Sequence, residues 1–126
     1  MLDAHAARIE AAIRGCAVVA TYALNTVQLS PNTGYVEGEI MFVDGSRLVF
    51  FEFWRRMVAG LDREKYRYHL MDANNQLLFR YDDAPHHPGV ATFPHHKHLP
   101  TGMTHSPAPH FAEVLAEAEA QVLGIP

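Results

Sequence analysis

The stretch VEGEIMFVDGSRLVFFEFW, residues 36–54, decides the fold class. Apolar side chains alternate with glutamates through residues 36–42, and this period of two predicts a strand with one face exposed to solvent. The dipeptide Asp44-Gly45 is a strong signal for a hairpin turn. The residues after the turn return as a second strand. Because Phe50 and Phe51 would face opposite sides, we expect that strand to be central in an antiparallel sheet.

Strand-like sequence continues on both sides of this hairpin. Residues 17–29 are rich in Val, Thr and Tyr, and residues 66–70 and 77–81 form a second predicted hairpin with asparagines at its turn. Residues 2–13 and 111–122 instead place apolar side chains three and four positions apart, which is typical of helices. The sequence therefore predicts an α+β fold. We expect an antiparallel meander sheet of about five strands, with an N-terminal and a C-terminal helix packed on it.

The length of 126 residues suits a single domain, 1–126. We divide it into an N-terminal helix (1–15), an antiparallel sheet (16–81), a His/Pro-rich loop (82–109) and a C-terminal helix (110–123). The loop has no periodicity and holds six of the eight prolines. Such long irregular segments are uncommon in compact domains unless they are functional or disordered, so we expect an ordered functional loop. Ser106 is the expected cap of the final helix.

Composition excludes several classes of protein. The formal net charge of −4 argues against a generic nucleic-acid coat. Cys16, expected to be buried, is the sole cysteine, which excludes an intramolecular disulfide and a thiolate zinc cage. No signal-peptide pattern and no apolar run of about 20 residues is present, so we expect a cytoplasmic protein without membrane association. A homodimer is also considered, with three aromatic residues either at its interface or in the core: Phe51, Phe53 and Trp54.

The chain has nine histidines, and five of them fall within thirteen residues: His86, His87, His95, His96 and His98. Histidine titrates near neutrality and is the commonest metal ligand. A core would not hold such a cluster, because buried polar groups are costly and charged imidazoles repel one another. The cluster therefore indicates surface chemistry. Three of the four remaining histidines are expected at the surface: His5, His105 and His110.

The second hairpin suggests an anion site. If its turn pairs Met71 with Gln76, Arg67 lies opposite Arg80, and His69 shares their face of the sheet. Two opposed arginines destabilise a strand pair unless an anion lies between them, and guanidinium groups bind phosphate bidentately. We therefore expect a site of the size of a phosphate group, covered by the histidine loop. The alternative is that a glutamate of a neighbouring strand neutralises the pair: Glu37, Glu39 or Glu52.

Three interpretations of the histidine loop stay open. In the first, His95 and His98 bind a metal ion, with His86, His87 or Asp82 completing the shell. In the second, two histidines act as general base and acid on a phosphodiester of RNA, and cations stabilise the charge that develops on phosphorus. This chemistry needs no metal, and nearby tyrosines would stack bases. In the third, the histidines only hold the loop in place.

The runs Tyr66-Arg67-Tyr68-His69, Leu78-Phe79-Arg80-Tyr81-Asp82 and Phe93-Pro94-His95-His96-Lys97-His98, together with His86-His87, closely resemble the TumE family. The resemblance covers roughly residues 34–115. It implies a growth-inhibiting toxin of a type II toxin–antitoxin module, neutralised by a protein antitoxin that often carries a helix-turn-helix domain. Ribonuclease activity is the mechanism suggested for such toxins.

Together these observations favour a metal-independent ribonuclease acting on RNA. The expected catalytic residues are His95 and His98 as acid and base, His86 as a substitute, Arg80 and Lys97 as phosphate ligands, and Asp82 as an orienting group. The expected substrate-binding residues are Arg67, His69, Tyr68, Tyr81, His96 and His87. The alternative is a non-catalytic or metal-binding protein that uses the histidine cluster as ligands.

Overall fold

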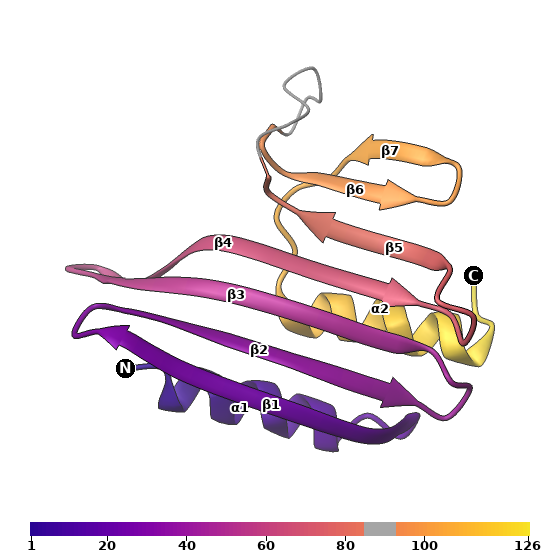
Figure 1. The fold of residues 1–126 in the computed structure, drawn as a ribbon, viewed down its shortest axis with the longest axis horizontal. Helices are drawn as coiled ribbons and strands as arrows, with labels where there is room; N and C mark the ends of the chain where they lie inside the picture. The colour runs from indigo at the N-terminus through magenta and orange to yellow at the C-terminus, as the bar shows by residue number, and fades with distance from the viewer. Residues whose placement is uncertain (85–92) are drawn as a thin grey trace.

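The computed structural model describes residues 1–84 and 93–126. In chain order the elements are α1 (Asp3–Arg14), β1 (Val19–Ser30), β2 (Thr33–Phe42), β3 (Arg47–Met57), β4 (Gly60–Met71), β5 (Leu77–Asp82), β6 (His96–Leu99), β7 (Gly102–His105) and α2 (Phe111–Leu123). Each strand pairs antiparallel with the strand before it, so the sheet order is β1-β2-β3-β4-β5-β6-β7 (Figure 1). The predicted α+β class, the antiparallel meander and its two terminal helices are confirmed.

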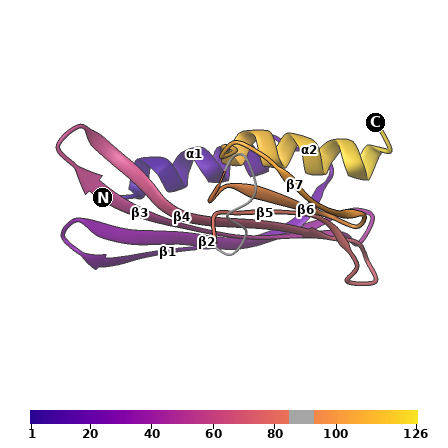
Figure 2. The ribbon, with the colours of Figure 1, turned by 90° about the horizontal axis from the view of Figure 1, so that it is seen from above.

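Both helices pack on the same side of the sheet (Figure 2). We call this side the helix face and the opposite side, which neither helix covers, the open face. The core lies between the sheet and the helices because alternate strand residues point there: Leu48 and Phe50 of β3 are fully buried, as is Tyr68 of β4. The Phe50 ring centre lies 4.9 Å from that of Phe111 in α2. Burying one such aromatic side chain contributes about 1.5–3 kcal/mol, which holds the helix against the sheet.

A buried carboxylate joins α1 to the sheet on the helix face. Glu52 of β3 is 1% exposed and accepts hydrogen bonds from the Tyr68 hydroxyl and, at 3.0 Å, from Trp54 Nε1. His5 Nε2 of α1 lies 2.7 Å from the same carboxylate. The prediction that His5 lies at the surface is therefore wrong, since its ring is largely covered and bonded to Glu52. Cys16 is buried as expected, and its thiol donates to Glu119 of α2 at 2.9 Å.

The sheet has seven strands rather than about five, because two short strands form within the expected 82–109 loop. β6 and β7 extend the sheet beyond β5 and pair its backbone groups. Their sequences, HKHL and GMTH, carry few of the β-branched and aromatic residues that mark strands. The N-terminal cap of α2 is His110 rather than Ser106, and its backbone N–H donates to Glu113. Neither helix of the described chain is long and apolar enough to cross a membrane.

The register of the second hairpin differs from the predicted one. Arg80 is paired with His69 rather than with Arg67, and Arg67 is paired with Asp82. The cause is an irregularity next to the turn, where Met71 pairs with Leu77 instead of Gln76. The two arginines still share the open face, because a pairing shift of two positions preserves the alternation of side chains.

Candidate functional site

Two rows of paired residues run across the open face, and the candidate site lies on their middle strands. The first row crosses all seven strands through Asn25, Glu37, Phe51, Arg67, Asp82, His96 and His105. The second row lies beside it and passes through Ala23, Glu39, Val49, His69, Arg80, His98 and Met103. Directly paired residues project to the same side of a sheet, so residues far apart in the sequence become neighbours. Cations, carboxylates and imidazoles meet where the rows cross β4, β5 and β6.

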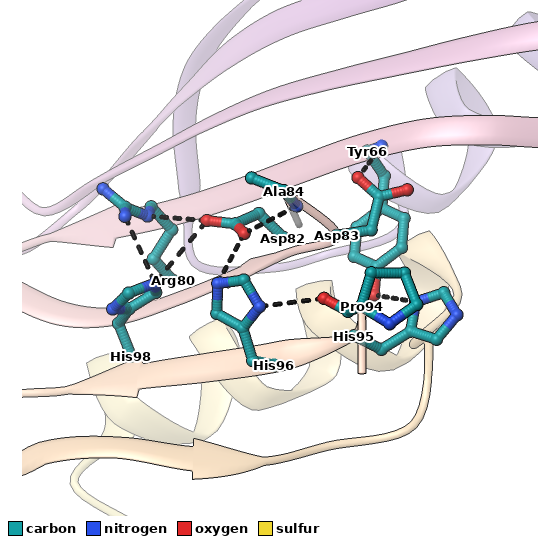
Figure 3. A network of polar contacts seen from close by, with 9 residues as sticks. All are labelled: Tyr66, Arg80, Asp82, Asp83, Ala84, Pro94, His95, His96 and His98. Atoms are coloured by element: carbon teal, nitrogen blue, oxygen red, sulfur yellow. Dashed lines mark hydrogen bonds and ion pairs between the residues drawn. The ribbon is translucent and has the colours of Figure 1, made fainter. Parts of the chain in front are cut away.

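Asp82 is the centre of the polar network (Figure 3). Its carboxylate is 8% exposed, lies 2.7 Å from His96 Nε2, and accepts a hydrogen bond from Arg80 Nε at 3.1 Å. His98 Nε2 lies 3.7 Å from the second carboxylate oxygen. The backbone N–H of Ala84 donates to Asp82 at 3.1 Å and holds the end of β5 in position. One buried carboxylate therefore lies within 4.0 Å of an arginine and two imidazoles.

Hydrogen-bond geometry separates the two histidines of β6. Arg80 Nη2 lies 3.2 Å from His98 Nε2, and because a guanidinium only donates, this nitrogen accepts from Arg80 whenever the His98 ring is neutral. His96 Nδ1 lies 2.9 Å from the carbonyl oxygen of Pro94, which only accepts. His96 is thus held between a carbonyl and a carboxylate and is 1% exposed. His98 is more accessible and faces the arginine, so it is the better placed of the two for chemistry.

A hollow of about 360 Å³ opens beside this network. Its lining residues are Phe51, Lys65, Tyr66, Arg67, Arg80, Asp82, Asp83 and Ala84. Arg67 and Lys65 are exposed and Arg80 is half-buried, and these three cations outnumber the two carboxylates of the lining, Asp82 and Asp83. The volume falls within the range of roughly 300–1,000 Å³ that small-molecule sites occupy. The hollow therefore has the size and the charge to hold an anionic group.

His69 lies on the other side of Arg80 from His98. Burial lowers the pKa of His69, and the nearby positive charges of Arg80, Arg67 and Arg47 lower it further. Its imidazole is consequently neutral at neutral pH, which is the state that a general base requires. Arg80 is thus flanked by an imidazole on each neighbouring strand.

The structure does not bring every expected site residue to this place. Lys97 alternates to the helix face, where its ammonium lies 2.7 Å from Glu117 of α2 and 4.7 Å from the centre of the Tyr81 ring. Tyr81 donates to Glu117, and Tyr68 is fully buried beneath α2. The expected roles of these three residues do not fit their positions, because strand alternation places them on the opposite side from Arg80.

His95 also lies apart from the network. Its Nδ1 lies 2.9 Å from the hydroxyl of Tyr66, and the two rings are nearly parallel with centres 5.8 Å apart. Tyr66 is itself buried and does not offer a face to a base. His86 and His87 lie outside the described residues.

The alternative that a glutamate neutralises the arginine pair is not what the described residues show. Glu52 points to the helix face, and Glu39 is 2.9 Å from Arg47. The carboxylate on Arg80 is Asp82. Phe51 was not predicted as a site residue and was expected in the core or at a dimer interface. Phe51 is paired with Glu37 on one side and with Arg67 on the other, which places it beside the site. Predicting this position requires the register of three strands.

The same network offers a possible metal-binding set. Asp82, His96 and His98 each present one ligand atom, and these atoms lie within 4.8 Å of one another. Imidazole and carboxylate are ligands of zinc, nickel and iron. The Arg80 guanidinium, however, contacts both Asp82 and His98 and places a positive charge where a metal ion would bind.

Comparisons with known proteins give one match. The sequence model of a protein family described as Toxin TumE matches residues 7–122, nearly the whole chain. No curated protein and no solved structure matches this chain.

Proposed function

The chain belongs to the TumE family of toxins, and from this premise we propose that it is a ribonuclease toxin whose active site is the Arg80–Asp82–His98 network on the open face. The family implies a toxin of a toxin–antitoxin system and an antitoxin protein as its partner. We propose further that the module is of type II, that the antitoxin carries a helix-turn-helix domain, and that RNA is the substrate. The observation that carries it is the position of Arg80, which lies between two imidazoles and beside Arg67 on one sheet face.

The proposed phosphate ligands are Arg67 and Arg80. Both guanidinium groups border the same hollow and offer paired N–H donors, which suit the oxygens of a phosphodiester. Asp82 holds Arg80 through Nε, and Arg80 Nη2 contacts His98. Removing Arg80 should therefore weaken both substrate binding and the stabilisation of charge in the transition state.

His69 and His98 are the proposed base and acid. Neutral His69 takes the proton of the ribose 2′-hydroxyl, and the resulting oxygen attacks phosphorus to give a 2′,3′-cyclic phosphate. The bond from phosphorus to the 5′-oxygen breaks, and this oxygen receives a proton from His98 in its protonated form, which the Asp82 carboxylate 3.7 Å away stabilises. Their α-carbons are two strand spacings apart, about 10 Å, with Arg80 on the strand between them. His98 keeps its expected role, and His69 takes the place of His95.

Growth arrest on controlled expression tests these assignments. We expect His98→Ala, His69→Ala and Arg80→Ala to abolish arrest while circular dichroism shows the same fold as the unmodified protein. Loss of one acid–base group reduces a rate by about 10²–10⁴-fold, which is enough to relieve toxicity. The matched controls are exposed residues of the same types, His105→Ala and Arg56→Ala, which should remain toxic. Undiminished arrest by both His98→Ala and Arg80→Ala would overturn the proposal.

A metal-binding protein is the second candidate, supported by the three ligand atoms of Asp82, His96 and His98. Metal analysis of protein purified without an affinity tag separates the two functions. One equivalent of zinc or nickel that is lost in His96→Ala would favour metal binding. Substoichiometric metal in both proteins would favour the ribonuclease.

A further inference from the structure

A second hollow lies on the open face next to the proposed phosphate site. Its volume is about 370 Å³, and its lining includes Asn25, Glu37, Glu39, Val49, Phe51 and Arg67. Phe51 and Arg67 also line the first hollow, so the two spaces adjoin at these side chains. The side chains of Phe51 and Arg67 therefore form a border that the two hollows share.

The spacing between the hollows suits one nucleotide. Phe51 is paired with Arg67, and Arg67 with Asp82, so Phe51 lies two strand spacings, about 10 Å, from the centre of the polar network. This separation matches the reach from a phosphate to the base of the adjoining nucleotide. A phosphate bound by Arg67 and Arg80 consequently places a neighbouring base over Phe51.

Phe51 offers an aromatic surface there. Its side chain is half-buried on the open face, and the Tyr35 ring packs beside it with centres 5.3 Å apart. This contact fixes the Phe51 ring, so little side-chain freedom is lost when a base stacks on it. Stacking on aromatic side chains is how proteins commonly hold unpaired bases of single-stranded RNA. Phe51 therefore replaces the buried tyrosines as the expected stacking residue.

Glu37 provides the hydrogen-bonding group of the second hollow. Glu37 lies on β2 and is paired with Phe51 of β3, and its carboxylate makes no hydrogen bond or ion pair within residues 1–84 and 93–126. Glu39, the other carboxylate of the hollow, is engaged by Arg47 at 2.9 Å. Both oxygens of Glu37 are thus available to accept hydrogen bonds from a ligand. A carboxylate repels phosphate, so the second hollow favours the base of a nucleotide over its phosphate.

We propose that the second hollow is a base-recognition site for guanine, with the base stacked on Phe51 and its Watson–Crick edge bound by the carboxylate of Glu37. Guanine is the standard base whose Watson–Crick edge presents two adjacent donors, N1–H and the N2 amino group. These match the two oxygens of one carboxylate in the way that a guanidinium does. The inference rests on the proposed ribonuclease function, since it assigns the nucleotide next to the cleaved bond.

Nucleotide binding tests the site without requiring cleavage. Titration calorimetry with 3′-GMP, 3′-AMP, 3′-CMP and 3′-UMP should show that 3′-GMP binds about tenfold more tightly or better, as expected for a paired polar contact to a base. Glu37→Gln should remove this preference, because an amide presents only one acceptor oxygen. The control Glu64→Gln lies at the exposed end of the β3–β4 hairpin and should keep it. Equal binding of the four nucleotides, or an unchanged preference in Glu37→Gln, would overturn the inference.

Mapping of cleavage products then separates this inference from the proposed function. RNA containing all four bases should be cut mainly beside guanines by the unmodified protein, and with little base preference by Glu37→Gln. Phe51→Leu should cut more slowly by about tenfold or more while its thermal unfolding shows that it is folded. A guanine preference in binding without any RNA cleavage would refute the ribonuclease and leave the base site standing. Cleavage without base preference would refute the base site and leave the ribonuclease standing.

Discussion

At the scale of single residues, the site depends on which side chains touch Arg80. Asp82 holds its Nε, His98 accepts from its Nη2, and His69 lies across the strand pair. A guanidinium in contact with a carboxylate and an imidazole is fixed in orientation, which is the preorganisation that stabilises developing charge. The same contacts give His69 and His98 different surroundings, because His98 is beside the carboxylate and His69 is beside three arginines.

The titration of His69 is a direct test of these surroundings. Burial and then the charges of Arg80, Arg67 and Arg47 lower its pKa below the ordinary value of 6.5. Removing a neighbouring cation stabilises the protonated ring, so Arg67→Ala should raise the pKa of His69. Imidazole resonances followed by NMR between about pH 5 and 8 measure the change around the unperturbed histidine value of about 6.5. Arg56→Ala, an exposed arginine elsewhere on the sheet, should leave the titration unaltered. A His69 that titrates above 6.5, or is indifferent to Arg67, would contradict the account.

At the scale of elements, the sequence predicts most of the sheet but not its last part. The alternation in β2 and β3 and the Asp44-Gly45 turn are strong local signals, and the structure shows the hairpin that they predict. β6 and β7 lack such a signal, because their stability comes from pairing with β5 rather than from their own side chains. The connection between β3 and β4 is short: β3 extends to Met57 and β4 begins at Gly60, whose positive φ of 130° suits glycine.

The same limit explains which site residues were predictable. Arg67, Arg80 and Asp82 share a face by simple alternation, and their motif runs made them candidates. Lys97 and His95 were predicted as site residues because they are next to His96 and His98 in the sequence. Their placement depends on the start of β6, which decides which of these residues project to the open face. If β6 were shifted by one residue, Lys97 would project to the open face in place of His96.

The attachment of α1 to the sheet through Glu52 should be sensitive to acid. Burial raises the pKa of Glu52, but hydrogen bonds from His5, Tyr68 and Trp54 outweigh it, and the pKa lies below its ordinary value. The folded state therefore binds this proton less readily than the unfolded chain. Its stabilising effect is complete above about pH 4.3 and is lost as the pH falls through the lower folded-state value.

Urea unfolding at a series of pH values measures this contribution. Glu52→Gln should lower the free energy of unfolding at neutral pH by about 1–3 kcal/mol, because donors in the core lose a charged acceptor. It should also flatten the fall in stability below about pH 4.3, where the unmodified carboxyl becomes protonated on unfolding. The exposed Glu64→Gln should change stability by no more than about 0.5 kcal/mol. Equal stability of Glu52→Gln and the unmodified protein would contradict the role of this network.

At the scale of the whole molecule, one face of the sheet holds the core and the other holds the candidate site. The helix face carries the core and the Glu52 network, and the open face carries the two hollows and their cations. The net charge of −4 does not favour RNA binding overall, so the proposed RNA binding requires the local positive charge of the open face.

A matched pair of charge reversals tests this division. Lys65→Glu on the open face should weaken RNA binding at about 0.15 M salt by about tenfold or more, because a cation beside the phosphate path becomes an anion. Arg8→Glu on α1 changes the net charge by the same amount on the helix face and should leave affinity nearly unaltered. Fluorescence anisotropy with a labelled single-stranded RNA gives both values. Equal losses in the two variants would mean that binding follows net charge rather than the open face.

The central claim is that imidazoles around Arg80 cleave RNA without a metal ion. Incubation of purified protein with RNA in excess chelator, compared with His98→Ala and the exposed control His105→Ala, tests it most directly. We predict cleavage by the unmodified protein and by His105→Ala with products that end in 2′,3′-cyclic phosphate, and a loss of about 10²–10⁴-fold in His98→Ala. Cleavage that chelator abolishes, or that His98→Ala retains in full, would contradict the account.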